Sequence, residues 1–211
     1  MTLSPKAIFL IAVVSVLSCA SSFAQAESDG SGVTINKKPL RDFGVAAINA
    51  IDARKVDIGA PFRIEFDVAL DNSSRIDSAK SRVTKIEGDK NAAELAKDGI
   101  IAVGESGFFG YLRHGGDAPK RLLIMVDSTK ASFSVAVKVE TASDSKAKTS
   151  ASSLSLLLSL GAATAKPEEQ LFFRNAGVAA EGRYYVIAMS LPAEVLREKV
   201  MSEVNKKAKS E

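Results

Sequence analysis

The sequence predicts an α+β fold built from successive strand–strand–helix units, with antiparallel strands and helices packed on one face of the sheet. Two observations support this. Several segments alternate apolar and polar residues with a period of two, which is typical of strands that bury one face. Each pair of such segments is joined by a short turn cluster and followed by a segment with helical apolar spacing. A signal peptide and a short helix are expected to precede these units.

The first 26 residues resemble a secretory signal peptide. Lys6 gives a positive start, and residues 7–17 are apolar apart from one serine. Small residues follow and end in Ala24-Gln25-Ala26, the A-x-A pattern that signal peptidases recognise. The apolar run is shorter than the about 20 residues of a membrane-spanning helix. We therefore expect cleavage after Ala26 and a periplasmic or secreted bacterial protein.

A second interpretation of this segment is lipidation of Cys19, because the residues before it loosely resemble a lipobox. A retained signal or a lipidated Cys19 would give a membrane-anchored form. Cleavage after Ala26 would instead leave 185 residues without cysteine, and hence without a disulfide or thiol chemistry. No second long apolar run follows, so we expect no membrane span after signal removal.

The charge balance argues against a nucleic-acid-binding protein. Beyond Ala26 the chain has 27 basic and 25 acidic residues, and the two signs are interspersed. Nucleic-acid binding depends on a concentrated basic face that displaces counterions. We expect the partner to be another envelope protein rather than nucleic acid. The sequence does not indicate an oligomeric state.

The first half of the exported chain divides into a leader and one unit. Residues 27–58 are predicted to form a polar leader and a short helix over residues 39–53. Residues 59–117 are predicted to form the first unit. Its strand alternates cleanly over residues 62–70, and a weaker strand returns over residues 81–87. Asn91 and Glu94 have the spacing of a capping box and predict the start of its helix.

The remaining region, residues 118–208, is predicted to hold two more units that continue the first. Strands are expected at residues 122–126 and 133–139, followed by a helix that begins near Ser143. A short helical piece at residues 168–174 precedes the third hairpin. Its strands are expected near residues 178–180 and 185–191, and Pro192 is expected to open the last helix.

A glycine-rich segment, IAVGESGFFGYLRH at residues 101–114, contains Ser106 and the single histidine, His114. A nucleophile elbow requires G-x-S-x-G after a strand, whereas Phe108 lies two positions after Ser106 in a helical pattern. Phosphate-binding loops precede a helix, and this segment falls near a helix end. We expect a helix break and close backbone approach at its glycines, Gly104, Gly107 and Gly110.

No residue is predicted to be catalytic, to bind a cofactor or to ligate a metal. His114 precedes two glycines and suits a helix end, and zinc sites need several histidine or cysteine ligands. Glu65 and Asp67 share a strand face and are interpreted as the solvent side of that strand rather than as an acid–base pair.

A leucine-rich stretch over residues 154–160 is the most apolar part of the chain after the signal. One interpretation is a central helix buried under its neighbours. The other is an exposed apolar strip that binds a partner or lipid. The candidate residues for this possible apolar binding surface are Leu154, Leu157, Leu158 and Leu160.

One stretch resembles a known family. FRIEFDVALDNSSRIDSAKSRVTKIEGD, followed by AAELAKDGIIAVGESGFFGYL, is similar to the C-terminal domain of TonB-type energy transducers in its order of strand, turn, returning strand and helix. The resemblance spans residues 62–112. It implies a periplasmic domain that binds a partner by strand addition to a sheet edge. Energy transduction is not expected, because the anchor looks cleavable and residues 30–61 contain only two prolines.

These observations lead to three hypotheses. The first is an exported, non-catalytic envelope protein that acts by protein–protein binding, through a sheet edge. The second is a periplasmic carrier of a hydrophobic ligand or lipid, held between the sheet and the leucine-rich helix. The third is an uncharacterised hydrolase.

Overall fold

The computed structural model describes residues 35–112, 119–165 and 167–198, and it is α+β as predicted. One antiparallel sheet of six strands has the order β2-β1-β3-β4-β6-β5. The strands are β1 (Phe62–Ala69), β2 (Arg82–Gly88), β3 (Arg121–Ser128), β4 (Ser132–Glu140), β5 (Ala176–Glu181) and β6 (Tyr184–Pro192). β1 of the predicted first unit pairs with β3 of the region predicted to hold the other two units, so all the units share one sheet.

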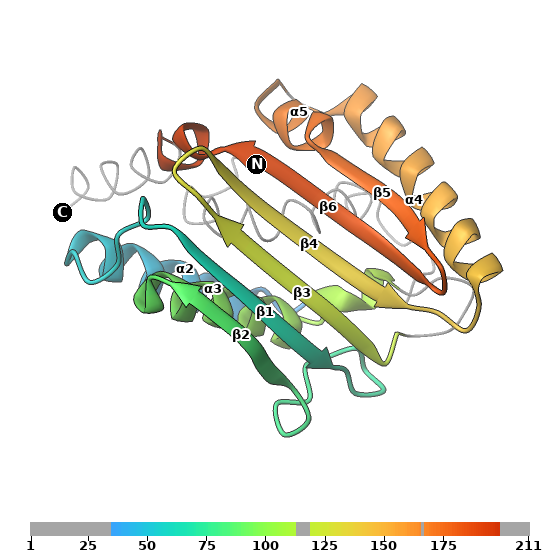
Figure 1. The fold of residues 1–211 in the computed structure, drawn as a ribbon, viewed down its shortest axis with the longest axis horizontal. Helices are drawn as coiled ribbons and strands as arrows, with labels where there is room; N and C mark the ends of the chain where they lie inside the picture. The colour runs from blue at the N-terminus through green and yellow to red at the C-terminus, as the bar shows by residue number, and fades with distance from the viewer. Residues whose placement is uncertain (1–34, 113–118, 166, 199–211) are drawn as a thin grey trace.

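The helices divide between the two ends of the sheet. Helices α2 (Lys37–Asp52) and α3 (Lys90–Glu105) lie behind the half formed by β1 and β2 (Figure 1). Helix α4 (Asp144–Thr164) runs beside β5 at the opposite edge, and α5 (Pro167–Arg174) follows it. The short 3-10 helix η2 (Phe108–Leu112) continues from α3, and residues 193–198 are helical after β6.

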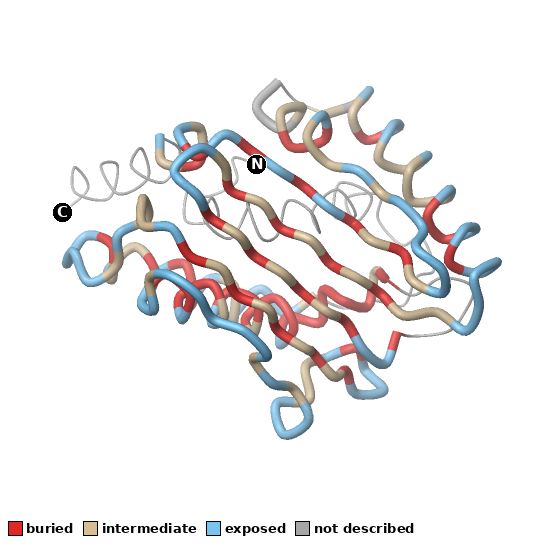
Figure 2. The backbone as a smooth tube through the Cα atoms, in the orientation of Figure 1, coloured by how far each residue is buried: buried red, intermediate tan, exposed pale blue. Residues whose placement is uncertain are grey.

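The period of two in the sequence is matched by the burial of the strands. Along β1, β3 and β4, buried and half-buried residues alternate (Figure 2). The buried face packs on the helices, with Ile64, Val68 and Val126 fully enclosed. Tyr185 of β6 also belongs to this core. Its hydroxyl donates to the Leu112 carbonyl at 3.2 Å, and burial raises the pKa of Tyr185.

Side-chain caps fix the helix starts, and one predicted start is wrong. Helix α3 begins one residue before Asn91, because the Asp89 carboxylate accepts from the Ala92 amide at 2.8 Å. The Asn91 side chain instead donates to the Lys55 carbonyl at 3.1 Å. Helix α4 begins directly after Ser143, as predicted, and the Ser143 hydroxyl caps it by accepting from the Lys146 amide. Pro192 is the last residue of β6, and the predicted last helix begins at the next residue, Ala193.

Candidate functional site

The two edges of the sheet differ in what covers them. At the β5 edge, α4 lies along the strand, and the Ser155 hydroxyl donates to the Val178 carbonyl at 3.4 Å. The Asn175 carbonyl accepts from the Ser190 amide, so these two residues form a hydrogen-bonded pair of the β5–β6 ladder. Hydrogen-bonded and non-hydrogen-bonded pairs alternate along an antiparallel ladder, and the backbone groups of Val178 therefore point away from β6. A helix that covers a strand edge in this way blocks the addition of another strand.

The outer edge of β2 has no such cover among the residues that the structure describes. β2 pairs with β1 alone, and its residues are exposed except for the half-buried Val83. The Asp89 amide donates to the Pro61 carbonyl, which makes this a hydrogen-bonded pair. Because hydrogen-bonded and non-hydrogen-bonded pairs alternate along the β1–β2 ladder, the backbone groups of Ile86 and Gly88 point outward, away from β1. This edge presents the donors and acceptors that an added strand would use.

A β-bulge ends the regular part of this edge. The β1–β2 register shifts between Glu65 and Phe66, which leaves Thr84 as an extra residue on β2. The Thr84 hydroxyl donates to the Glu65 carbonyl at 3.1 Å and holds the bulge in place. The bulge was not predicted, and the weak alternation of residues 81–87 is the only signal of it in the sequence.

A groove of about 210 Å³ lies beside the bulge. Its walls come from β1, β2, α3 and the loop between β1 and β2. The apolar residues that line the groove are Phe66, Ile76, Val83 and Ile101. The polar residues that line it are Ser78, Ser81, Arg82 and Lys97.

The charges that line the groove are both positive. Lys97 forms an ion pair with Glu94 one turn earlier on α3, and its side chain remains 26% exposed. Arg82 contacts Asp67 only through Nε, at 3.7 Å, and is 72% exposed. Asp67 is already bound by Arg121 through distances of 2.7 and 2.5 Å, and these hydrogen bonds hold the pKa of Asp67 below its ordinary value. The Arg82 guanidinium is therefore available to another anion.

The loop that forms one wall is held in a fixed shape. The Asp71 carboxylate accepts from the Ser73 and Arg75 amides at 2.8 and 2.9 Å. The Ser81 hydroxyl donates to the Asp77 carbonyl at 2.8 Å and accepts from the Ala69 amide. The groove is therefore largely pre-formed.

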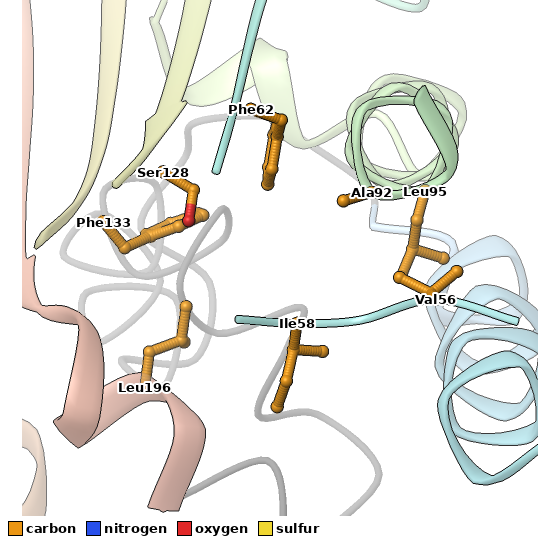
Figure 3. A pocket seen from close by; sticks show the side chains of 8 residues that line it. All are labelled: Val56, Ile58, Phe62, Ala92, Leu95, Ser128, Phe133 and Leu196. Carbon is orange, nitrogen blue, oxygen red and sulfur yellow. The ribbon is translucent and has the colours of Figure 1, made fainter. Parts of the chain in front are cut away.

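A second cavity lies under the sheet where β1 begins and β3 ends, and it has room for one water molecule at most. Its volume is about 10 Å³, at the lower limit for holding water. Its lining is apolar apart from the Ser128 hydroxyl, as Figure 3 shows. We interpret it as a packing gap in the core.

The glycine-rich segment acts structurally, as predicted. Helix α3 ends at Glu105, and Gly107 has a φ of +82°, a conformation that glycine adopts at little cost. Ser106 is fully buried, and its hydroxyl donates to the Val103 carbonyl at 2.6 Å. A buried hydroxyl with this partner is not placed to attack a substrate. His114 lies outside the described residues.

The two carboxylates of β1 are held by arginines rather than by each other. Glu65 pairs with Arg63 at 2.7 Å, and Asp67 pairs with Arg121. Within the described ranges, no group of three histidine, cysteine, aspartate or glutamate side chains is arranged to bind a metal ion. Across the same ranges, no helix has the length and apolar character needed to cross a bilayer.

The leucine-rich helix lies at an edge of the sheet and is not buried on all sides. Leu156 and Leu160 are 62% and 51% exposed, while Leu154, Leu157 and Leu158 are half-buried. The interpretation as a buried central helix is therefore wrong, because α4 contacts the sheet only through one side, at β5 and β6. None of these leucines lines either of the cavities described above.

The residues predicted for export, Ala24 and Ala26 at the cleavage site and Cys19 for lipidation, lie outside the described residues. Comparison with known proteins adds no functional residue: no family model, curated protein or solved structure matches the chain.

Proposed function

We propose that this chain is an exported, non-catalytic envelope protein that binds another envelope protein by strand addition to the outer edge of β2. The observation that carries the proposal is the difference between the two edges. Helix α4 covers the β5 edge, whereas β2 presents Ile86 and Gly88 backbone groups that lack a strand partner within the described chain. The charged groove beside this edge would supply side-chain specificity.

The carrier and hydrolase hypotheses have less support. A lipid carrier needs an apolar cavity, usually of several hundred Å³. The cavity under the sheet has a volume of about 10 Å³, and neither cavity reaches the α4 leucines. A hydrolase needs a nucleophile beside a base, and Ser106 is buried against a backbone carbonyl.

Strand addition is tested by removing one outward donor from β2. The Ile86→Pro variant lacks the amide that would donate to the added strand. The β1–β2 ladder keeps its hydrogen bonds, because Ile86 and its partner Ile64 form a non-hydrogen-bonded pair. Ile86→Ala is the matched control, since it shortens the same side chain and keeps the amide. Circular dichroism and urea unfolding check that both variants fold.

Binding is read by photo-crosslinking in a Gram-negative host. A photoreactive amino acid replaces Glu87 on β2 in the full-length protein, and Glu181 on β5 in the control. We expect one adduct from position 87 that persists with Ile86→Ala and disappears with Ile86→Pro. Adducts that survive in folded Ile86→Pro, or that form equally from position 181, would refute strand addition at β2.

Export is tested separately by fractionating the same cells and weighing the intact protein. We expect a soluble periplasmic species that begins at Glu27. A membrane-bound species that retains residues 1–26, or a mass that shows lipid on Cys19, would mean that the protein is anchored to a membrane rather than free in the periplasm.

A further inference from the structure

We infer that the segment received by β2 is a free C terminus whose last residue is apolar. The inference rests on the proposed strand addition and names the chemistry of the partner. It combines three features that meet at one end of β2: the apolar groove, the two cations on its lining, and the bulge where regular pairing stops.

The groove has the size of a site for one side chain. Its volume of about 210 Å³ lies below the roughly 300–1,000 Å³ that is typical of small-molecule pockets. Phe66 forms part of the lining and is 5% exposed, and Val83 brings the lining directly to the β2 edge. A peptide strand beside β2 therefore has an apolar recess for one of its alternating side chains.

The charges complement a carboxylate at the same place. Arg82 and Lys97 line the groove, and none of the described residues that line it is acidic. Asp67 accepts its hydrogen bonds from Arg121, so the guanidinium of Arg82 can donate hydrogen bonds to a second anion. Glu94 competes for Lys97, which makes Lys97 the contact that can be strengthened by substitution.

The direction of the sheet's strands favours a C terminus here. All the strand pairs of this sheet are antiparallel, and a strand added in the same manner runs opposite to β2, so its last residue lies near Arg82 and Val83. Beyond Arg82 the protein's own chain turns, with the Ser81 and Lys80 amides donating to the Asp77 carbonyl. A strand that ends at the bulge pairs only with the regular part of β2.

The test compares peptides that differ only at their C termini. A pooled library of acetylated pentapeptides is made in free-acid and amide forms and selected against the full-length protein. We expect enrichment of free acids with an apolar last residue, and about tenfold weaker binding when an enriched peptide is converted to its amide. Equal enrichment of acids and amides, enrichment of peptides with an internal acidic residue, or no enrichment from either pool would overturn the inference.

Variants connect the selectivity to the groove. Lys97→Gln and Arg82→Gln should each reduce the ratio between free acid and amide, whereas Lys90→Gln, at the exposed start of α3, should not change it. Glu94→Gln should raise affinity for the free acid because it releases Lys97. An unchanged ratio in both groove variants would refute the assignment.

Hydrogen exchange separates failure of this inference from failure of strand addition. A peptide bound as an added strand slows exchange of the Ile86 amide whether it ends in an acid or an amide. Protection of Ile86 without acid selectivity would leave strand addition standing and reject the C terminus. Binding with acid selectivity but without Ile86 protection would confine the peptide to the groove and reject strand addition.

Discussion

Gly104 of α3 packs directly against Ile76 of the β1–β2 loop. A Cβ atom added at Gly104 would lie 2.1 Å from Ile76 Cγ1 and 2.3 Å from its Cδ1. Only a residue without a side chain allows this approach, and it fixes one wall of the groove. The glycine spacing in the sequence predicted close approach here, and the structure identifies the partner.

We therefore expect Gly104→Ala to destabilise the protein by about 1–3 kcal/mol, because Ile76 must move out of a packed position. Urea unfolding measures the loss. Gly177→Ala is the matched control, since a Cβ at Gly177 meets no atom within 4 Å. A Gly104→Ala protein as stable as the wild type would mean that the loop yields freely and that the groove is not pre-formed.

A second prediction concerns the end of α2. Arg54 has a φ of +53°, a left-handed conformation that costs a residue with a side chain about 1–2 kcal/mol. Its amide donates to the Ile51 carbonyl and the Lys55 amide donates to the Ala50 carbonyl, which is the Schellman pattern that favours glycine.

Arg54→Gly should accordingly raise the free energy of unfolding, by about 0.5–1 kcal/mol after the greater freedom of glycine in the unfolded chain is included. Arg54→Ala, which keeps the strained conformation, serves as the control and should give no such gain. Equal stability of the glycine and alanine variants would show that the backbone conformation carries no strain.

The parts of this fold that depend on local pattern could be predicted from the sequence. The alternation of apolar and polar residues at residues 62–70 and 133–139 predicts strands, because one face of each strand is buried and the other is partly exposed to solvent. Ser143 predicts the start of α4 because its cap is local. Asp89 was missed in favour of Asn91, since both residue types suit a cap.

The candidate site was less predictable because it depends on long-range placement. The leucines of residues 154–160 indicate an apolar helix, but the sequence does not say that it covers the β5 edge with one side alone. The groove needs Ile76, Val83 and Lys97 to meet, and these residues come from a loop, a strand and a helix. Within the described part of the chain, the edge at Ile86 has no neighbouring strand because β2 is the first strand in the order of the six-stranded sheet.

A third prediction concerns pH. Hydrogen bonds from Arg121 hold the pKa of Asp67 below its ordinary value of 3.8. A lowered folded-state pKa stabilises the protein above the unfolded-state value, and this contribution is lost as the pH falls through the folded-state pKa. At pH 7, Asp67→Asn should therefore lower the free energy of unfolding by about 1 kcal/mol.

The pH dependence distinguishes this charge effect from a change in packing. The difference between Asp67→Asn and wild type should shrink as the pH falls below about 3.8 and the wild-type carboxyl becomes protonated. Urea unfolding at several pH values measures it. A difference that stays constant from pH 7 to pH 2 would show that the carboxylate charge is not responsible.

The last prediction concerns the outer side of α4. Leu156 is 62% exposed, so Leu156→Lys should change the free energy of unfolding by no more than about 0.5 kcal/mol. Ala151, five residues earlier on the same helix, is 6% exposed and faces the protein. Ala151→Lys should cost several times more, because a buried ammonium loses its hydration without gaining a partner. Urea unfolding of both variants, at a concentration where the protein is monomeric, makes the comparison. If Leu156→Lys proved as costly as Ala151→Lys, the outer face of α4 would be covered in the folded protein and α4 would not end the sheet at this edge.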